Sequence, residues 1–371
     1  MKKHLSSIAA LLIAALTFTS CGSDDPAPYI PTPVEVSNGA FFIGSGNKSA
    51  SIMGNLTYYD YAKGTAMLTP FETANGIELG LTANDGIVYG SKLYIVVDNE
   101  NTIFVCNKNT LKIITRISTT DMLGAEAGIS PRHIIADGGS IYFTTYGKVV
   151  AKIDTTAFTL QKTYNVGSYP EGLAITDDGN LYVCNSDYGY GNASLSKINL
   201  STGNVTEIKD ELITNPNSIV ASGNDIYYLD YGKYDDSWNQ IEGTTGVRKV
   251  TAAGAVSKVC EGTTMGYANG IIYTASAPYG ATGVDFYSYN IATGQSQKLN
   301  DKIDIAHPAA IGVDPVSGDI FIAAQQDKGG YASYKDPCTV THYGADFSVK
   351  KTFPVGVGIC SIFFNTGVEL R

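Results

Sequence analysis

Residues 169–208 read YPEGLAITDDGNLYVCNSDYGYGNASLSKINLSTGNVTEI, and they contain four short β-rich runs separated by turn residues. A proline stands ahead of the first run, and DDGN at 177–180 is a tight-turn sequence before the second. The third run, at 194–200, alternates polar and apolar residues, which is the period of a half-buried strand. A second turn, STGN at 201–204, leads into the fourth run. The segment therefore predicts four consecutive strands.

The same pattern recurs along the chain. An aliphatic residue followed by an aromatic one opens a β-rich run at successive steps of 40 to 52 residues, after a looser first copy. The copies are Phe41-Phe42, Leu93-Tyr94, Ile141-Tyr142, Leu181-Tyr182, Ile226-Tyr227, Ile272-Tyr273 and Ile320-Phe321. Short strands at this period indicate propeller blades.

The two ends of the repeat region complement each other. The run at 357–364 reads as a first strand with no blade after it, whereas the first blade, near 39–67, lacks a first strand. Pairing the two would protect both sheet edges. We therefore predict an all-β, seven-bladed β-propeller of four-stranded blades with little helix, whose ring is closed by the C-terminal strand. One blade has a degenerate start near Met265.

The repeats resemble those of YncE-like and NHL-like propellers, which run Pro-x-Gly-Ile-Ala-x-Asp-x-x-Gly-x-Leu-Tyr-Val and then Ile-Asp-x-x-Thr-Gly. Residues 169–183 and 197–203 match this pattern best. The resemblance implies the fold and does not specify a function, because one propeller fold hosts many functions.

The N-terminus has the layout of a secretory signal peptide. Lys2 and Lys3 precede an apolar run from Leu5 to Phe18, which is too short for a membrane span. Cys21 then stands where the bacterial lipobox has its lipidated cysteine, with Phe18 in place of the usual leucine. We expect residues 1–20 to be a lipoprotein signal peptide and Cys21 to carry lipid after cleavage.

The residues after Cys21 extend this prediction. An acidic pair at Asp24 and Asp25 resembles the surface-export signal of Bacteroidetes lipoproteins, although a solvated linker would read the same way. A Pro-rich stretch follows and would form an extended tether over residues 21–38, ahead of a propeller domain at 39–371. The expected location is the outer membrane, lipid-anchored and facing the cell exterior.

Composition narrows the class of partner. The formal net charge is −10 at pH 7, which disfavours binding to nucleic acid and to anionic lipid. Five cysteines follow Cys21, with no CxxC pair, so we expect buried free thiols rather than a disulfide framework or a metal site. They are Cys106, Cys184, Cys260, Cys338 and Cys360.

Long loops rich in tyrosine follow the second strands of blades four to seven. Long loops on a rigid scaffold commonly carry function, and tyrosine offers flat apolar area with a polar tip. Tyrosines inside the strand dipeptides are instead expected to pack between blades. The candidate ligand-binding residues are Arg132, Tyr146, Tyr169, Tyr188, Tyr190, Asn217, Tyr234, Asp236, Trp238, Tyr279, His307, Tyr331 and Tyr334.

Motifs of catalysis are missing from the sequence. It contains no Gly-x-Ser-x-Gly, no His-Glu-x-x-His and no phosphate loop, and it lacks the tryptophans expected of quinone-cofactor propellers. His133 and His307 occupy what read as equivalent positions at blade starts and could both point into the channel. Two isolated histidines are more often structural than metal ligands, so we assign no metal, no cofactor and no catalytic residue.

A lipidated, tyrosine-faced propeller with an acidic export signal resembles the BtuG group, Bacteroidetes lipoproteins that capture vitamin B12. That resemblance implies a corrinoid (cobalamin) ligand and a TonB-dependent outer-membrane transporter as partner. Two alternatives stay open. One is a metal-dependent lactonase- or lyase-like enzyme, whose mark would be four or more convergent acidic, amide and histidine side chains; Glu171, Asn217 and His307 supply part of that set. The other is a non-catalytic adhesion or scaffold propeller.

Overall fold

The computed structural model describes residues 32–237, 239–278, 281 and 283–370. One compact unit spans Glu35–Val368. The predicted signal peptide, Cys21, most of the tether, Trp238 and Tyr279 lie outside the described residues. The predicted domain boundaries therefore stay a prediction.

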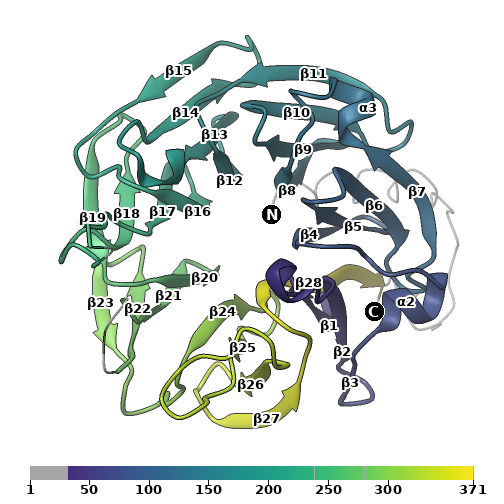
Figure 1. Cartoon of the computed structure of the whole chain (residues 1–371), viewed down its shortest axis with the longest axis vertical. Coiled ribbons are helices and arrows are strands. Elements are labelled where there is room, and N and C mark those ends of the chain that lie inside the picture. The colour runs from purple at the N-terminus through teal and green to yellow at the C-terminus, as the bar shows by residue number, and fades with distance from the viewer. Residues whose placement is uncertain (1–31, 238, 279–280, 282, 371) are drawn as a thin grey trace, which may run out of the picture. The chain divides into compact units, whose positions relative to one another are not determined.

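Seven four-stranded sheets are arranged around a central channel (Figure 1). Blade one has β1 (Pro33–Gly44), β2 (Asn55–Asp60), β3 (Thr65–Met67) and the C-terminal β28 (Ile359–Leu370). Blade two has β4 (Ala83–Tyr89), β5 (Lys92–Val97), β6 (Thr102–Asn107) and β7 (Ile113–Ser118). Blade three has β8 (Pro131–Asp137), β9 (Ser140–Thr145), β10 (Val149–Asp154) and β11 (Leu160–Asn165).

The remaining blades repeat this order. Blade four has β12 (Pro170–Ile175), β13 (Asn180–Asn185), β14 (Ser194–Asn199) and β15 (Val205–Ile208). Blade five has β16 (Pro216–Ser222), β17 (Asp225–Asp230), β18 (Gly246–Val250) and β19 (Val256–Cys260). Blade six has β20 (Thr264–Ala268), β21 (Ile271–Ser276), β22 (Asp285–Asn290) and β23 (Gln295–Lys298). Blade seven has β24 (Pro308–Val313), β25 (Ile320–Ala324), β26 (Thr339–Tyr343) and β27 (Val349–Pro354).

Ring closure follows the prediction. β28 lies beside β1, so blade one runs β28-β1-β2-β3 and takes its innermost strand from the end of the chain (Figure 1). Backbone bonds from Ser45 N to Gly358 O (2.9 Å) and from Gly46 N to Val357 O (3.1 Å) continue the pairing. The degenerate start predicted near Met265 is β20.

Helix is scarce, as expected. The described residues contain α2 (Pro70–Asn75), α3 (Thr119–Leu123) and two single 3-10 turns, η1 (Lys48–Ala50) and η2 (Asp187–Gly189). None of the helices in this described part of the chain combines the length and apolar character needed to cross a bilayer.

The core lies between neighbouring blades. Phe41 and Ile43 of blade one, for example, share an apolar cluster with Leu93 and Ile95 of blade two. The tyrosines of four strand dipeptides are at most 2% exposed, which confirms their packing role; they are Tyr94, Tyr142, Tyr182 and Tyr227. Each blade is thus fixed by both neighbours, and the channel wall is correspondingly rigid.

Four of the five described cysteines are buried free thiols, as predicted. The prediction was wrong for Cys360, which is exposed. Its strand, β28, is innermost in its blade, and the thiol donates to the carbonyl oxygen of Asn84 at 3.3 Å instead of entering an apolar cluster. An innermost strand can turn side chains towards the channel, and periodicity alone does not show which ones.

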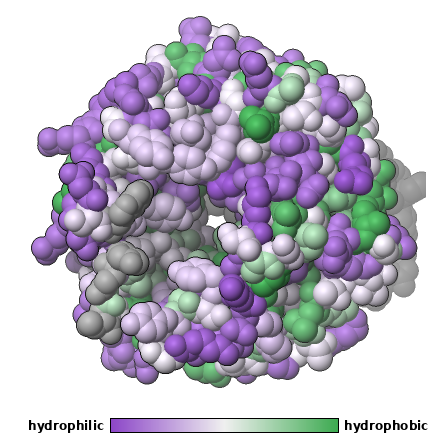
Figure 2. Space-filling view, in the orientation of Figure 1, coloured by the Kyte–Doolittle hydropathy of each residue, from purple (hydrophilic) through white to green (hydrophobic). Residues whose placement is uncertain are grey.

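A backbone hydrogen bond recurs at the start of five blades. The residue after the second strand donates its N–H to the carbonyl of the residue before the first strand, at 3.0–3.1 Å. These rim pairs are Asp98–Thr82, Tyr146–Ser130, Ser186–Tyr169, Tyr231–Asn215 and Gln325–His307. They fix where each loop leaves its sheet. Figure 2 shows the opening at the centre of the ring, with hydrophilic residues over much of the surrounding face.

Candidate ligand-binding site at the channel mouth

A cavity of about 540 Å³ lies beside the channel, and rim pairs from four consecutive blades build it. Its lining is Lys48, Thr82, Asp98, Asn99, Ser130, Arg132, Tyr146, Glu171, Ser186, Tyr188, Asn215, Asn217 and Tyr231. Blades two to five each contribute both a first-strand side and a loop side. We call this space the mouth cavity.

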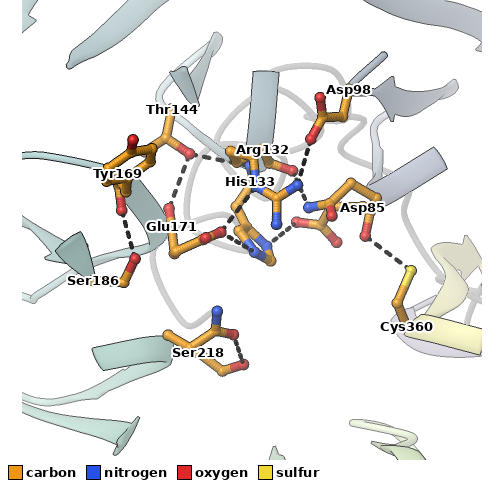
Figure 3. Close-up of polar contacts among 12 residues, drawn as sticks. Asp85, Asp98, Arg132, His133, Thr144, Tyr169, Glu171, Ser186, Ser218 and Cys360 are labelled. Carbon is orange, nitrogen blue, oxygen red and sulfur yellow. Dashed lines mark hydrogen bonds and ion pairs between the residues drawn. The ribbon is translucent and has the colours of Figure 1, made fainter. Parts of the chain in front are cut away.

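β-Bulges explain why so many polar residues face it. In β8, Pro131 pairs with Thr145 and Ile134 with Phe143, so Arg132 and His133 together lie opposite a single residue of β9. The same shift occurs in β12 at Glu171 and in β16 at Asn217. A bulge breaks the strict alternation of a strand and re-aims side chains. Arg132 and His133 can therefore both reach the channel although they are adjacent in sequence (Figure 3).

Arg132 is held by two carboxylates and one ring. Its Nε donates to Glu171 Oε2 at 3.0 Å and its Nη1 to Asp98 Oδ2 at 2.5 Å (Figure 3). The guanidinium also lies 4.7 Å from the centre of the Tyr146 ring. Charge-assisted bonds and the stacked ring fix the planar head in one orientation.

Glu171 is the centre of the network and is 3% exposed. Besides Arg132, it accepts from the Tyr146 hydroxyl at 2.6 Å and lies 3.6 Å from His133 Nε2. Burial alone would raise the pKa of this carboxyl, but the hydrogen bond from His133 and the charges of Arg132 and His133 lower it. The Glu171 carboxylate is consequently charged, and both of its oxygens already accept hydrogen bonds from protein groups.

His133 bridges two acids. Its Nδ1 lies 3.1 Å from Asp85 Oδ2, on the side away from Glu171 (Figure 3). Burial opposes the charged ring, but the hydrogen bonds to Asp85 and Glu171 raise the pKa of His133 to about 9. The imidazole is therefore protonated at neutral pH, and both of its nitrogens face carboxylates.

Tyrosines form the other side of the cavity. The Tyr169 ring lies 4.1 Å from that of Tyr188 and 5.2 Å from that of Tyr146, and Tyr190 extends the row at 6.4 Å from Tyr188. Tyr169 (φ 49°) and Tyr188 (φ 51°) both have left-handed backbone, which is strained for an aromatic residue. Tyr188 is nevertheless 52% exposed, so part of this strained aromatic row is open to solvent.

The arrangement suits binding better than proton transfer. The nitrogens of His133 and the oxygens of Glu171 are engaged with each other and with Arg132 and Tyr146. No group of three or more His, Cys, Asp or Glu side chains placed to hold a metal occurs among the described residues. The cavity therefore offers a ligand tyrosine rings for stacking, and amide, hydroxyl and cationic side chains of the protein for hydrogen bonding.

The structure brings together part of the predicted site. Arg132, Tyr146, Tyr188 and Asn217 line the mouth cavity. Tyr169 and Tyr190 belong to the tyrosine row beside it. The remaining described candidates do not line this cavity, and they are Tyr234, Asp236, His307, Tyr331 and Tyr334. Of these, Tyr331 and Tyr334 are 78% and 63% exposed in the loop of blade seven.

The predicted equivalence of His133 and His307 is wrong. His307 precedes β24 and accepts the rim bond from Gln325, so its counterpart in blade three is Ser130. His133 lies three residues further on, inside the bulge. His307 Nε2 lies instead 3.5 Å from Asp327 Oδ2. The two histidines therefore do not form the paired site considered from the sequence.

Sequence reasoning missed Lys48, Asp85, Asp98, Ser186 and Tyr231. Three of these follow a second strand directly, after Val97, Asn185 and Asp230. Their shared position was a usable signal, because the repeat aligns the ends of all second strands. Asp85 and Lys48 had no comparable signal, since one depends on a bulge and the other on a loop of blade one.

Comparison with known proteins supports the fold only. No family model matches the sequence, and no curated protein does. A quinonprotein alcohol dehydrogenase-like protein from Bacteroides thetaiotaomicron is 16% identical with a TM-score of 0.59, over 89% of this chain and 78% of that one. A putative 6-phosphogluconolactonase from Bacteroides uniformis is 13% identical with a TM-score of 0.57, over 89% of this chain and 100% of the other.

A second putative 6-phosphogluconolactonase, from Bacteroides fragilis, is 14% identical with a TM-score of 0.57, over 88% of this chain and 98% of that one. Identities this low carry no residue roles across. The chain is a seven-bladed β-propeller whose structural neighbours include lactonase-like and quinoprotein-like propellers.

Proposed function

We propose that this protein captures a small ligand at the mouth cavity without transforming it. The observation that carries the proposal is the convergence of Arg132, Tyr146, Tyr188 and Asn217 on one cavity of about 540 Å³. Cavities of roughly 300–1,000 Å³ are the usual size of small-molecule sites. A few fixed polar groups beside aromatic surface are their usual lining.

Preorganisation supports binding at this place. Arg132 and Tyr146 are held by Glu171 before any ligand arrives, at 3.0 and 2.6 Å. Side chains that are already ordered lose little entropy on binding, so more of the contact energy becomes affinity. The strained backbone of Tyr169 and Tyr188 points the same way, because such strain is concentrated at functional sites.

Within this class we propose a corrinoid as the ligand. A flat macrocycle with an amide rim would stack on the exposed face of Tyr188 and bond through its amides to Asn217 and Arg132. A corrinoid is larger than the cavity, so part of it would lie across the neighbouring loops, including Tyr190. The protein would be anchored through Cys21 in the outer membrane, facing outward, and would pass its ligand to a TonB-dependent transporter.

The test is calorimetric titration of the mature chain, carrying Cys21→Ser so that no lipid is attached, with cyanocobalamin. We expect one-to-one binding that weakens about tenfold or more in Tyr188→Ala and in Asn217→Ala, as for central contacts of an interface. Tyr331→Ala removes a still more exposed tyrosine outside the cavity and should bind normally. Absence of heat at high micromolar ligand overturns the corrinoid proposal, and an equal loss in Tyr331→Ala overturns the location.

A lactonase- or lyase-like enzyme is the second candidate. Asp85, His133 and Glu171 lie together at the channel, and Glu171 shares the mouth cavity with Asn217. These contacts supply part of the set of converging side chains that such an enzyme needs. A protonated His133 could supply a proton to a leaving group. Turnover of a lactone panel by the purified protein, with and without added divalent metal, and its loss in His133→Asn would favour this candidate over capture.

A further inference from the structure

One wall of the mouth cavity carries two cationic side chains held by consecutive residues. Directly after β5, Asp98 Oδ2 accepts from Arg132 Nη1 at 2.5 Å and Asn99 Oδ1 accepts from Lys48 Nζ at 2.6 Å. A single turn therefore places both cations at the same cavity, although they come from blades one and three.

The two cations differ in how far they are neutralised. Lys48 has no carboxylate within ion-pair distance among the described residues, because its partner Asn99 is neutral. Arg132 uses Nε and Nη1, and its Nη2 has no hydrogen-bond partner in the same described part of the chain.

The nearby carboxylates do not cancel this effect for a ligand inside the cavity. Asp98 and Glu171 face Arg132, and Asp85 faces His133. Counting all of them, three acids are balanced by Lys48, Arg132 and protonated His133. Both oxygens of Glu171 and both oxygens of Asp85 accept from protein donors, as does Oδ2 of Asp98. Lys48 Nζ spends one N–H on Asn99 and has others to offer a ligand. An anion in the cavity would thus meet donors first.

Aromatic rings also line the cavity. Tyr146, Tyr188 and Tyr231 are all in its lining, and Tyr188 and Tyr231 are 52% and 37% exposed. Tyrosine faces favour a flat body, and the lysine and arginine favour an acid group at its edge.

We propose that the ligand of the mouth cavity is a planar molecule with an attached anionic group, a carboxylate or a phosphate ester, which Lys48 and Arg132 bind. This inference rests on the proposed capture function and narrows its ligand class. It assigns Lys48, in the loop of blade one, as a specificity-determining residue for an anion.

Two matched fluorescent probes test it: anilinonaphthalene sulfonate, and N-phenylnaphthylamine, which has the same rings without the acid. The neutral probe is the more apolar, so unspecific binding would favour it. In titrations of the mature Cys21→Ser chain we expect the sulfonate to bind about tenfold more tightly, and to weaken with added salt. Lys48→Gln should remove that preference, and Tyr188→Ala should weaken both probes.

The control is Lys335→Gln, which makes the same charge change on an exposed lysine in the loop of blade seven and should keep the preference. Equal affinity for both probes, with loss of both in Tyr188→Ala, overturns the anion inference and leaves the capture site standing. Binding of neither probe, or binding that Tyr188→Ala does not change, contradicts the capture site and the anion inference together.

Discussion

Glu171 lies at the meeting point of two blades, with its Oε2 3.0 Å from Arg132 Nε and its backbone in β12. Arg132 lies in the neighbouring blade, so this ion pair joins two sheets across the channel wall. The same carboxylate accepts the Tyr146 hydroxyl, which places a binding residue and a structural bond on one group.

Glu171→Gln should therefore destabilise the fold and weaken ligand binding together. The substitution keeps the shape but leaves Arg132 without one of its two carboxylates in a mostly buried place. Breaking a buried pair from one side costs roughly 3–5 kcal/mol of unfolding free energy. Urea unfolding followed by circular dichroism measures it. Glu242→Gln, at an exposed loop position, is the matched control; equal stability of the two variants would contradict this account.

Stability should fall as the solution becomes alkaline. Folding raises the pKa of His133 from 6.5 to about 9, with Asp85 and Glu171 as its partners, so the folded state binds this proton more tightly. The contribution is complete below pH 6.5 and is lost as the pH rises through about 9. We expect the protonated His133 to contribute on the order of 2 kcal/mol to the free energy of unfolding. This is less than the full pKa shift would give, because His133 is partly exposed and solvent screens its charge.

Unfolding free energies across this pH range, for the unsubstituted chain and for His133→Asn, provide the check. The variant should be less stable at neutral pH and should lack the alkaline slope. A slope that survives in His133→Asn would assign the titration to another group.

Closure of the ring should depend on the buried apolar side chains of β28. Phe364 is 9% exposed and packs 5.7 Å from the Phe321 ring, in a cluster that joins blades one and seven. Phe364→Ala should cost about 3–5 kcal/mol, as for other large-to-small changes in a core. Val368→Ala, near the exposed end of the same strand, should cost little. Thermal unfolding of both variants distinguishes a structural closing strand from a dispensable one.

Cys360 should be the thiol that reacts in the native state, and it should react slowly. It is exposed while the other four described cysteines are buried. Burial of the sulfur itself raises its pKa to about 12, so little thiolate forms at neutral pH. Peptide mapping after iodoacetamide treatment of the Cys21→Ser chain should find label at Cys360, increasing with pH. Label at Cys106 under native conditions would mean that the blades open.

The repeat made the fold predictable and left much of the site unpredictable. Dipeptides such as Leu181-Tyr182 mark second strands because these strands are buried on both faces, and counting the dipeptides gives seven blades. The partners of Arg132 lie 34 and 39 residues away, at Asp98 and Glu171. The period shows that these residues belong to adjacent blades. The bulge that turns Arg132 and His133 to the same side has no such signature.

For the tyrosine-rich loops too, the sequence predicted the general location and not the individual contacts. Composition indicated that aromatic loops would crowd one face, and Tyr188 and Tyr190 do stand in a row there. It did not separate Tyr188, at the cavity, from Tyr331, which is outside its lining. Tyr188 also has a left-handed backbone, a property that local sequence does not dictate for tyrosine.

The rim pairs make the channel mouth tolerant of change. Each is a bond between two main-chain groups, so it survives substitution of the side chains at Asp98, Tyr146, Ser186 and Tyr231. The loops that begin there can lengthen or vary without moving their point of attachment. One scaffold could in this way acquire a succession of ligand preferences by drift at four positions, while the blades beneath stay under selection for packing alone.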